Sequence, residues 1–466
     1  MRPMNLMSKT ILGLVGAVVI AQSAGAFSLT GPIESWQTAD LDYGARPIQG
    51  GAELGGPKNL GDEYRLNTPI ITYGFDFTFL DYFGSNGVKA VDAAFAVYNK
   101  LPAVSRTSAD LSEYLTEGNQ RINQTAQALN VLDLKSHTMW LIIEHMGLMS
   151  ETHTFDLRQR IPPPSAPACF FNYVVINRNF DPITFEPSHY VNGLLYTYQI
   201  QDLCPVRSVG DAVEIPVDPT GIVPTSVASG ISGIQFGGFY LGLTRDDVGG
   251  LRYLYRHDNY NNEVLPPGAT ATSQVSPWTP IGFGFTNVLA TNTLALRGGI
   301  EKVSFVKTRY DSLFGTGFRP ITYTYTIPIV TNFHLVNQTV RRTIFQPDIL
   351  FTAADISAPP VYSATTRSIS FVTNGATSVI TTAGPGIIAP QMIVTFNKIG
   401  QFLFNSNPFF LDEETATPEF VWGSFDGTTN APVIYPQGTS IRDIESQVLN
   451  PALVDTNVPG TYNPVF

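Results

Sequence analysis

The sequence has few charged residues and very few of the residues that carry catalytic or metal chemistry. Only 14% of its 466 residues are charged, against about 25% in an ordinary soluble domain. It has two cysteines and six histidines, and it contains neither the H-E-x-x-H motif of zinc proteases nor the G-x-S-x-G motif of serine hydrolases. These absences leave the chain without a recognisable catalytic centre, and we lean toward a protein that is not an enzyme.

Positive charge and long apolar runs are also scarce. The formal net charge is −11, and an acidic chain repels phosphate backbones, so we expect no nucleic-acid partner. After residue 26 no stretch approaches the roughly 20 apolar residues that a membrane-spanning helix needs. The sequence therefore predicts no transmembrane span.

The first 26 residues have the composition of a cleavable signal peptide. Arg2 and Lys9 give a positive start, an apolar stretch follows over 10–21, and Ala24 and Ala26 supply small side chains at the −3 and −1 positions of a cleavage site. We therefore expect an exported protein, located outside the cell, on the cell surface or in the periplasm.

Composition along the remaining chain predicts an α+β N-terminal domain followed by an all-β, sandwich-like C-terminal region. Residues 27–65 are rich in glycine, proline and polar residues and predict an extended lead-in. Residues 66–262 mix strand and helix patterns, and residues 263–280 have the composition of a linker. Residues 281–466 form β-branched and aromatic runs separated by turn residues about every ten positions, which predicts one or two β-rich modules.

Apolar spacing predicts three helices in the first domain, over 88–101, 132–148 and 244–255. A strand is predicted over 67–76. Gly147 is expected to end the second helix. Thr244 is expected to cap the third, with Asp247 three positions later completing a capping-box start.

The two cysteines, Cys169 and Cys204, predict a disulfide bond, because an isolated pair in an exported chain most simply pairs with itself. The bond would close a loop of about 36 residues and stabilise the fold by roughly 4 kcal/mol. Two buried free thiols are the alternative.

Residues around the second helix are the main candidates for zinc-type metal binding or peptide hydrolysis. The weak metal set is His137, His145 and His153, and Glu144 and His145 are the alternative catalytic pair. His137 and His145 are eight residues apart, about 12 Å along a helix, which is too far to share one ion. We therefore expect His145 to cap a helix end and His137 to be half-exposed.

Oxygen-rich segments at 412–414 and 258–263 lack the spacing of a calcium-binding loop. No cofactor is predicted, and calcium is left open.

The segment 246–255, with the sequence DDVGGLRYLY, resembles the last catalytic-domain helix of matrixin-type metalloproteases. The resemblance implies a matrixin-like core for the first domain, degenerate because the zinc motif is missing. Segments 55–69 and 79–88, together with 246–254, are similar to uncharacterised exported bacterial proteins of verrucomicrobial and planctomycete type. That resemblance implies bacterial export and a shared domain organisation, and it implies no particular activity.

The sequence hypothesis for function is an exported, non-catalytic structural or surface protein that assembles with itself or with the cell envelope. Low charge, a strand-rich second half and the missing catalytic motifs favour it. A divergent secreted hydrolase of metallopeptidase type and a secreted carbohydrate- or protein-binding module are the alternatives.

Overall fold

The computed structural model describes residues 25–32, 56–116, 119–150, 155–165, 167–205, 210–218, 226–230, 234–272, 295–310, 317–331, 334–354, 361–368, 386–398, 403–404, 415–416, 421–436 and 438–439. Residues 1–24 of the predicted signal peptide lie outside these ranges, whereas Gly25 and Ala26 lie inside them. The fold is mostly β-structure, with 42% strand and 20% helix. A strand-rich chain was expected, and this coarse prediction is confirmed.

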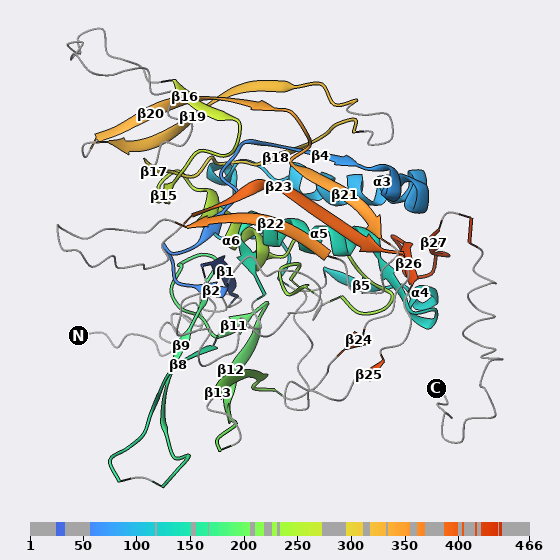
Figure 1. Cartoon of the computed structure of the whole chain (residues 1–466). Coiled ribbons are helices and arrows are strands. Elements are labelled where there is room, and N and C mark those ends of the chain that lie inside the picture. Colours follow the sequence, from blue (N-terminus) through green and yellow to red (C-terminus); the bar gives the residue numbers. More distant parts are fainter. Residues whose placement is uncertain are drawn as a thin grey trace, which may run out of the picture.

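The central element is a mixed sheet whose strands run in the order β18-β4-β21-β23-β22. Neighbouring strands are parallel except at the edge, where β22 is antiparallel to β23. The short strand β3 pairs in parallel with the first residues of β23. Helix α3 packs against β18, β4 and β21 of this sheet (Figure 1), and α5 packs against α3. The bounds are β3 Tyr64–Arg65, β4 Ile70–Phe75, β18 Ser304–Lys307, β21 Ile349–Ala354, β22 Val361–Ser368 and β23 Gly386–Asn397.

Helix α3, Phe77–Asn99, begins at Phe77 rather than at Val88 as predicted. Asp76 caps it, its carboxylate accepting the backbone N–H of Phe79 at 3.0 Å. One residue inside it, Gly84, has φ of +56° and interrupts the helical geometry. The chain therefore has a kink at Gly84 within one longer helix, which glycine permits because it has no Cβ.

Helices α5, Leu134–Met146, and α6, Arg245–Tyr255, match their predicted positions. Gly147 ends α5 at φ +113°, as expected, and a Cβ there would lie 2.4 Å from the Tyr64 carbonyl oxygen. Side chains from α3, α5 and α6 and from the central sheet share one hydrophobic core. The remaining helices are short, α4 Gln124–Ala128 and the 3-10 helix η1 Val104–Arg106.

A second sheet has the strand order β15-β17-β19-β20-β16. Its longest part is the hairpin β19–β20, paired along eleven positions from Ile321↔Ile344 to Thr331↔His334. The bounds are β15 Asn261–Glu263, β16 Ala269–Thr272, β17 Ala295–Arg297, β19 Ile321–Thr331 and β20 His334–Ile344. Within the predicted linker, Glu263 ends strand β15 and Ala269–Thr272 form strand β16.

The predicted lead-in also forms strands. Phe27 in β1 is fully buried, and β1 pairs with β2, β7 and β10. These strands are β1 Phe27–Gly31, β2 Gly56–Lys58, β7 Leu148–Met149 and β10 Asn179–Phe180. The segment reads as irregular in the sequence because its partners lie far away along the chain.

The hairpin β8–β9 and the three-stranded antiparallel sheet β11–β12–β13 extend from the central body (Figure 1). They have a small core of their own. The remaining pairs are β5 with β14, β26 with β6 and β27, and β24 with β25. The bounds are β5 Gln120–Ile122, β6 Val131–Asp133, β8 Phe155–Ile161, β9 Asn172–Asn177, β11 Tyr190–Val191, β12 Leu194–Asp202, β13 Gly210–Pro216, β14 Gly238–Tyr240, β24 Leu403–Phe404, β25 Thr415–Ala416, β26 Val421–Ser424 and β27 Val433–Ile434.

The predicted split into residues 66–262 and 281–466 is not confirmed, because the central sheet uses strands from both sides. β4 pairs in parallel with β18 and with β21. A buried polar network reinforces the connection: Arg65 donates to Glu263 at 2.5 Å and to the Arg297 carbonyl oxygen at 2.9 Å. In the described part of the second half, strands β18, β21, β22 and β23 belong to the central sheet, whereas β17, β19 and β20 belong to the antiparallel second sheet.

No helix in the described part of the chain is long and apolar enough to cross a membrane.

Candidate functional site

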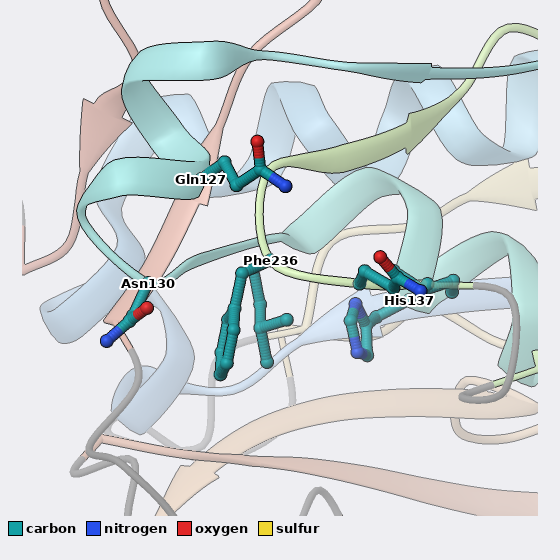
Figure 2. Close-up of a pocket in the computed structure, with 7 residues that line it drawn as sticks. Gln127, Asn130, His137 and Phe236 are labelled. Carbon is teal, nitrogen blue, oxygen red and sulfur yellow. The ribbon is translucent and has the colours of Figure 1, made fainter. Parts of the chain in front are cut away.

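A pocket of about 440 Å³ lies at the start of helix α5 (Figure 2). This is within the usual range of about 300–1,000 Å³ for small-molecule sites. Its wall comes from α4, from the turn after it, from β6, from the first turn of α5 and from the residues before β14. The lining residues are Gln127, Asn130, Leu132, His137, Ile234, Gln235 and Phe236.

His137 is the chemically distinctive side chain in this wall. It is 1% exposed, and its Nδ1 lies 3.1 Å from the carbonyl oxygen of Asp133. A carbonyl oxygen only accepts, so Nδ1 carries the proton and Nε2 of the neutral ring carries a lone pair. Nε2 has no hydrogen-bond partner among the described residues. The prediction that His137 is half-exposed is therefore wrong.

Burial also fixes the charge of this imidazole. It lowers the pKa of His137 to about 4, against a smaller opposing effect of the hydrogen bond to Asp133. The ring of Trp422, from β26, meets the imidazole edge-on at 5.0 Å between centroids. His137 is thus a neutral hydrogen-bond acceptor held rigidly at the pocket wall.

A glycine holds the segment over 234–236 against α4 and β6. Gly237 has φ of +72°, and a Cβ there would lie 2.5 Å from both the Asn123 carbonyl oxygen and the Gln127 nitrogen. Its N–H donates to Val131 at 2.8 Å and its carbonyl accepts from Asn123 at 2.7 Å. This close approach places Phe236 in the pocket wall.

The other polar groups of the wall are three carboxamides, from Gln127, Asn130 and Gln235. In Figure 2 the ring of Phe236 lies between Asn130 and His137. Among the described residues, no Asp, Glu, Lys or Arg side chain lines the pocket. The arrangement offers an aromatic surface, uncharged donors and acceptors, and one buried acceptor.

The hydrolytic alternative finds little support from the placement of its residues. Glu144 accepts the indole N–H of Trp140 at 2.9 Å, and Nδ1 of the buried His145 donates to the Leu141 carbonyl oxygen at 2.5 Å. Burial lowers the pKa of His145 to about 4. His153 lies outside the described residues. Within the described ranges, no three His, Cys, Asp or Glu side chains group closely enough to share a metal ion.

The predicted cap of helix α6 is confirmed. Thr244 and Asp247 form a reciprocal capping box, with the Thr244 N–H on the Asp247 carboxylate at 2.8 Å. The same carboxylate accepts the N–H groups of Val227 at 3.0 Å and Ala228 at 2.9 Å. Asp247 therefore anchors a distant segment as well as its own helix.

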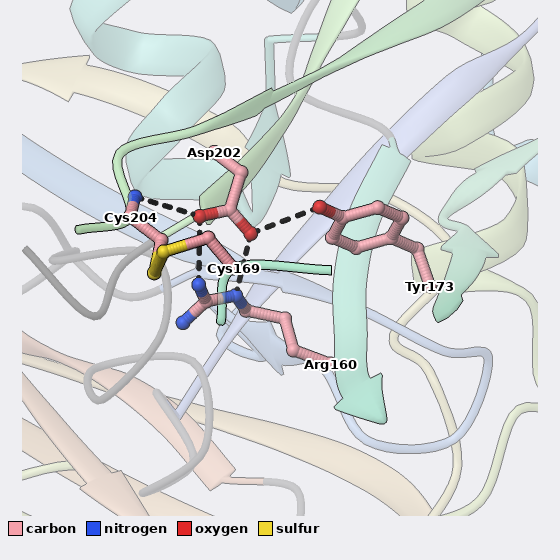
Figure 3. The surroundings of a disulfide bond; sticks show 5 residues. All are labelled: Arg160, Cys169, Tyr173, Asp202 and Cys204. Carbon is pink, nitrogen blue, oxygen red and sulfur yellow. Dashed lines mark hydrogen bonds and ion pairs between the residues drawn. A yellow bond between two sulfur atoms is a disulfide. The ribbon is translucent and has the colours of Figure 1, made fainter. Parts of the chain in front are cut away.

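The predicted disulfide between Cys169 and Cys204 is present, and no free cysteine remains. Its surroundings are polar (Figure 3). The Asp202 carboxylate accepts two hydrogen bonds from Arg160, at 2.8 and 2.7 Å, and one from the Tyr173 hydroxyl at 3.0 Å. These hydrogen bonds connect β8, β9 and β12, and we assign them a structural role.

Sequence reasoning missed the pocket, apart from His137. Its carboxamides and Phe236 come from two segments about a hundred residues apart, and no spacing rule connects them. Two residues at the edge of the pocket, Asn130 and Gly237, have positive φ. Asn and Gly are the residue types that adopt this backbone conformation in sharp turns, so they are the local sequence feature that could have indicated the site. Comparisons with known protein families, with curated protein sequences and with solved structures found no match to this chain.

Proposed function

We propose that this chain is an exported, non-catalytic binding protein whose pocket around His137 holds an uncharged polar ligand, a carbohydrate residue. The observation that carries the proposal is the buried Nε2 of His137, which has a lone pair and no partner among the described residues. A buried acceptor without a donor is costly, and a ligand hydroxyl would satisfy it.

The other groups of the pocket fit the same ligand class. Phe236 offers an apolar ring face to the C–H side of a sugar. The carboxamides of Gln127, Asn130 and Gln235 offer both donors and acceptors to hydroxyl groups. The absence of charged side chains in the described wall disfavours anionic and cationic ligands, because a buried charge needs a partner.

The test is binding of the intact exported protein to a panel of neutral, acidic and amino sugars, followed by calorimetry on any ligand found. Gln127→Ala should weaken binding of a neutral sugar several-fold. Gln124→Ala is the matched control, since it lies on the same short helix outside the pocket wall. Equal affinity in both variants, or selective binding of a charged ligand, would count against the proposal.

Self-assembly is the second candidate, supported by apolar exposure on the longest hairpin. Leu335 and Val336 of β20, beside the hairpin turn, are 63% and 45% exposed. Electron microscopy of protein released from its own cells should then show ordered filaments, sheets or rings. Leu335→Ser with Val336→Thr should dissolve them, whereas discrete particles for the unaltered protein would exclude this function.

A further inference from the structure

A buried carboxylate, that of Asp246, lies against the segment where the predicted leader ends. Asp246 is fully buried in the first turn of α6. Its Oδ2 accepts the backbone N–H of Ala26 at 2.9 Å and that of Asn192 at 2.7 Å. Its Oδ1 has no hydrogen-bond partner among the described residues. The pocket around His137 does not involve this group.

The Asp246 carboxylate has no positively charged partner among the described residues. Burial raises the pKa of Asp246 to about 7, although the two backbone N–H groups and the charge of Arg245 act in the opposite direction. No ion pair to Asp246 occurs within the described part of the chain. A fully buried carboxylate is stable as an ion only when a cation or several donors satisfy it.

The residue before Ala26 covers the unsatisfied oxygen. A Cβ added to Gly25 would lie 2.0 Å from Asp246 Oδ1, so the Gly25 backbone occupies the space through which a donor would reach that atom. The Gly25 carbonyl oxygen accepts a hydrogen bond from the Ser188 hydroxyl at 2.8 Å. Removing Gly25 would open Oδ1 to the nitrogen that already touches Oδ2.

We infer that the exported chain is cut between Gly25 and Ala26, and that the new α-ammonium of Ala26 forms a buried ion pair with Asp246. The leader allows this cut, because Ser23 and Gly25 are small residues at the −3 and −1 positions. The cut hydrolyses the Gly25–Ala26 peptide bond with one water, leaving a carboxylate on the released leader. An ammonium donates three hydrogen bonds where the peptide N–H donates one.

This places the mature end one residue earlier than the sequence pattern, which favours a cut after Ala26. Ala26 is fully buried and supplies the N–H on Asp246, so a cut after it would remove both contacts. The ion pair would attach β1, and with it the buried ring of Phe27, to the start of α6.

The first measurement is the intact mass of the protein exported through its own leader. The expected first residue is Ala26. A chain beginning at Phe27 or at Gly25, or one that keeps the leader, would overturn the inference.

The second measurement compares melting temperatures of chains made to begin at Ala26 or at Ala24 by a fusion protease that leaves no extra residue. The Ala26 form should melt several degrees higher, and Asp246→Asn should abolish that difference. Asp258→Asn, an exposed acid just after the same helix, is the control and should leave the difference intact. If Asp246→Asn lowers both forms equally, Asp246 has only a structural role and the ion pair is excluded.

Discussion

Helices α5 and α6 both begin at an acidic residue, but they differ in whether the buried polar groups near that start have hydrogen-bond partners. Each has an acidic residue at its start, Asp133 capping α5 and Asp247 completing the box of α6. At α6 the carboxylate is saturated by backbone N–H groups from two segments. At α5 the first turn carries His137, which lines a pocket and whose buried Nε2 has no hydrogen-bond partner among the described residues. One helix start therefore has its acidic side chain fully hydrogen-bonded, whereas the other is followed by a buried acceptor that has no partner among the described residues.

Removing the acid of the saturated helix start should have the largest effect. Asp247→Ala leaves the N–H groups of Thr244, Val227 and Ala228 buried without an acceptor. Each costs about 1–3 kcal/mol, so we expect a loss of at least about 3 kcal/mol in the free energy of unfolding. Urea denaturation measures it, with Asp258→Asn as the exposed control. A loss below about 1 kcal/mol would contradict the assigned anchoring role.

Breaking the disulfide tests whether a remote region affects the pocket. The cysteines are 35 positions apart, and Cys169→Ser with Cys204→Ser should lower the stability of the hairpins β8–β9 and β12–β13 by about 3–4 kcal/mol. Ligand affinity at the pocket should stay unchanged, because these hairpins have a separate small core. Hydrogen exchange locates the loosened region, and exchange spreading into α5 would show that the two regions are coupled.

The protonation of His137 in helix α5 should make the free energy of unfolding depend on pH. Its pKa is about 4 when folded and about 6.5 when unfolded, so between these values the unfolded chain binds the extra proton. The free energy of unfolding should therefore fall as pH drops from 6.5 to 4, by about 3 kcal/mol from this residue. His145 adds a fall of the same sign, and the raised pKa of Asp133, about 6, opposes both.

His137→Gln removes one of these contributions and should make the pH dependence shallower over that range. The measurement is urea denaturation of both chains at several pH values, with the chains also compared near pH 8, where His137 is neutral in either state. An unchanged slope would mean that His137 is charged in the folded protein.

Phe236→Leu should give the smallest effect. The substitution keeps an apolar side chain of similar bulk but removes the flat ring, so we expect about a tenfold loss of sugar affinity, equal to about 1.4 kcal/mol. The melting temperature should not change, since Phe236 is only partly buried at the core edge. A large drop in melting temperature would instead make Phe236 a core residue.

The sequence predicted the locally determined features well. The ends of α5 and α6 follow from Gly147, Thr244 and Asp247, whose roles depend on neighbours within a few residues. The disulfide followed from there being two cysteines. The start of α3 was wrong, because its first turns contain aromatic residues that are poor helix formers alone but pack into the core.

The sequence by itself determined the acidic balance, the helix caps, the disulfide and the strand-rich character, because composition and short spacing fix these. Only the tertiary structure decided that β4 pairs with β18 and β21, that β1 is buried, and that His137 faces a pocket. The physical reason is that each depends on contacts between segments far apart in the chain. Whether a polar atom such as the Nε2 of His137 is satisfied depends on those distant neighbours, and a local pattern carries no information about them.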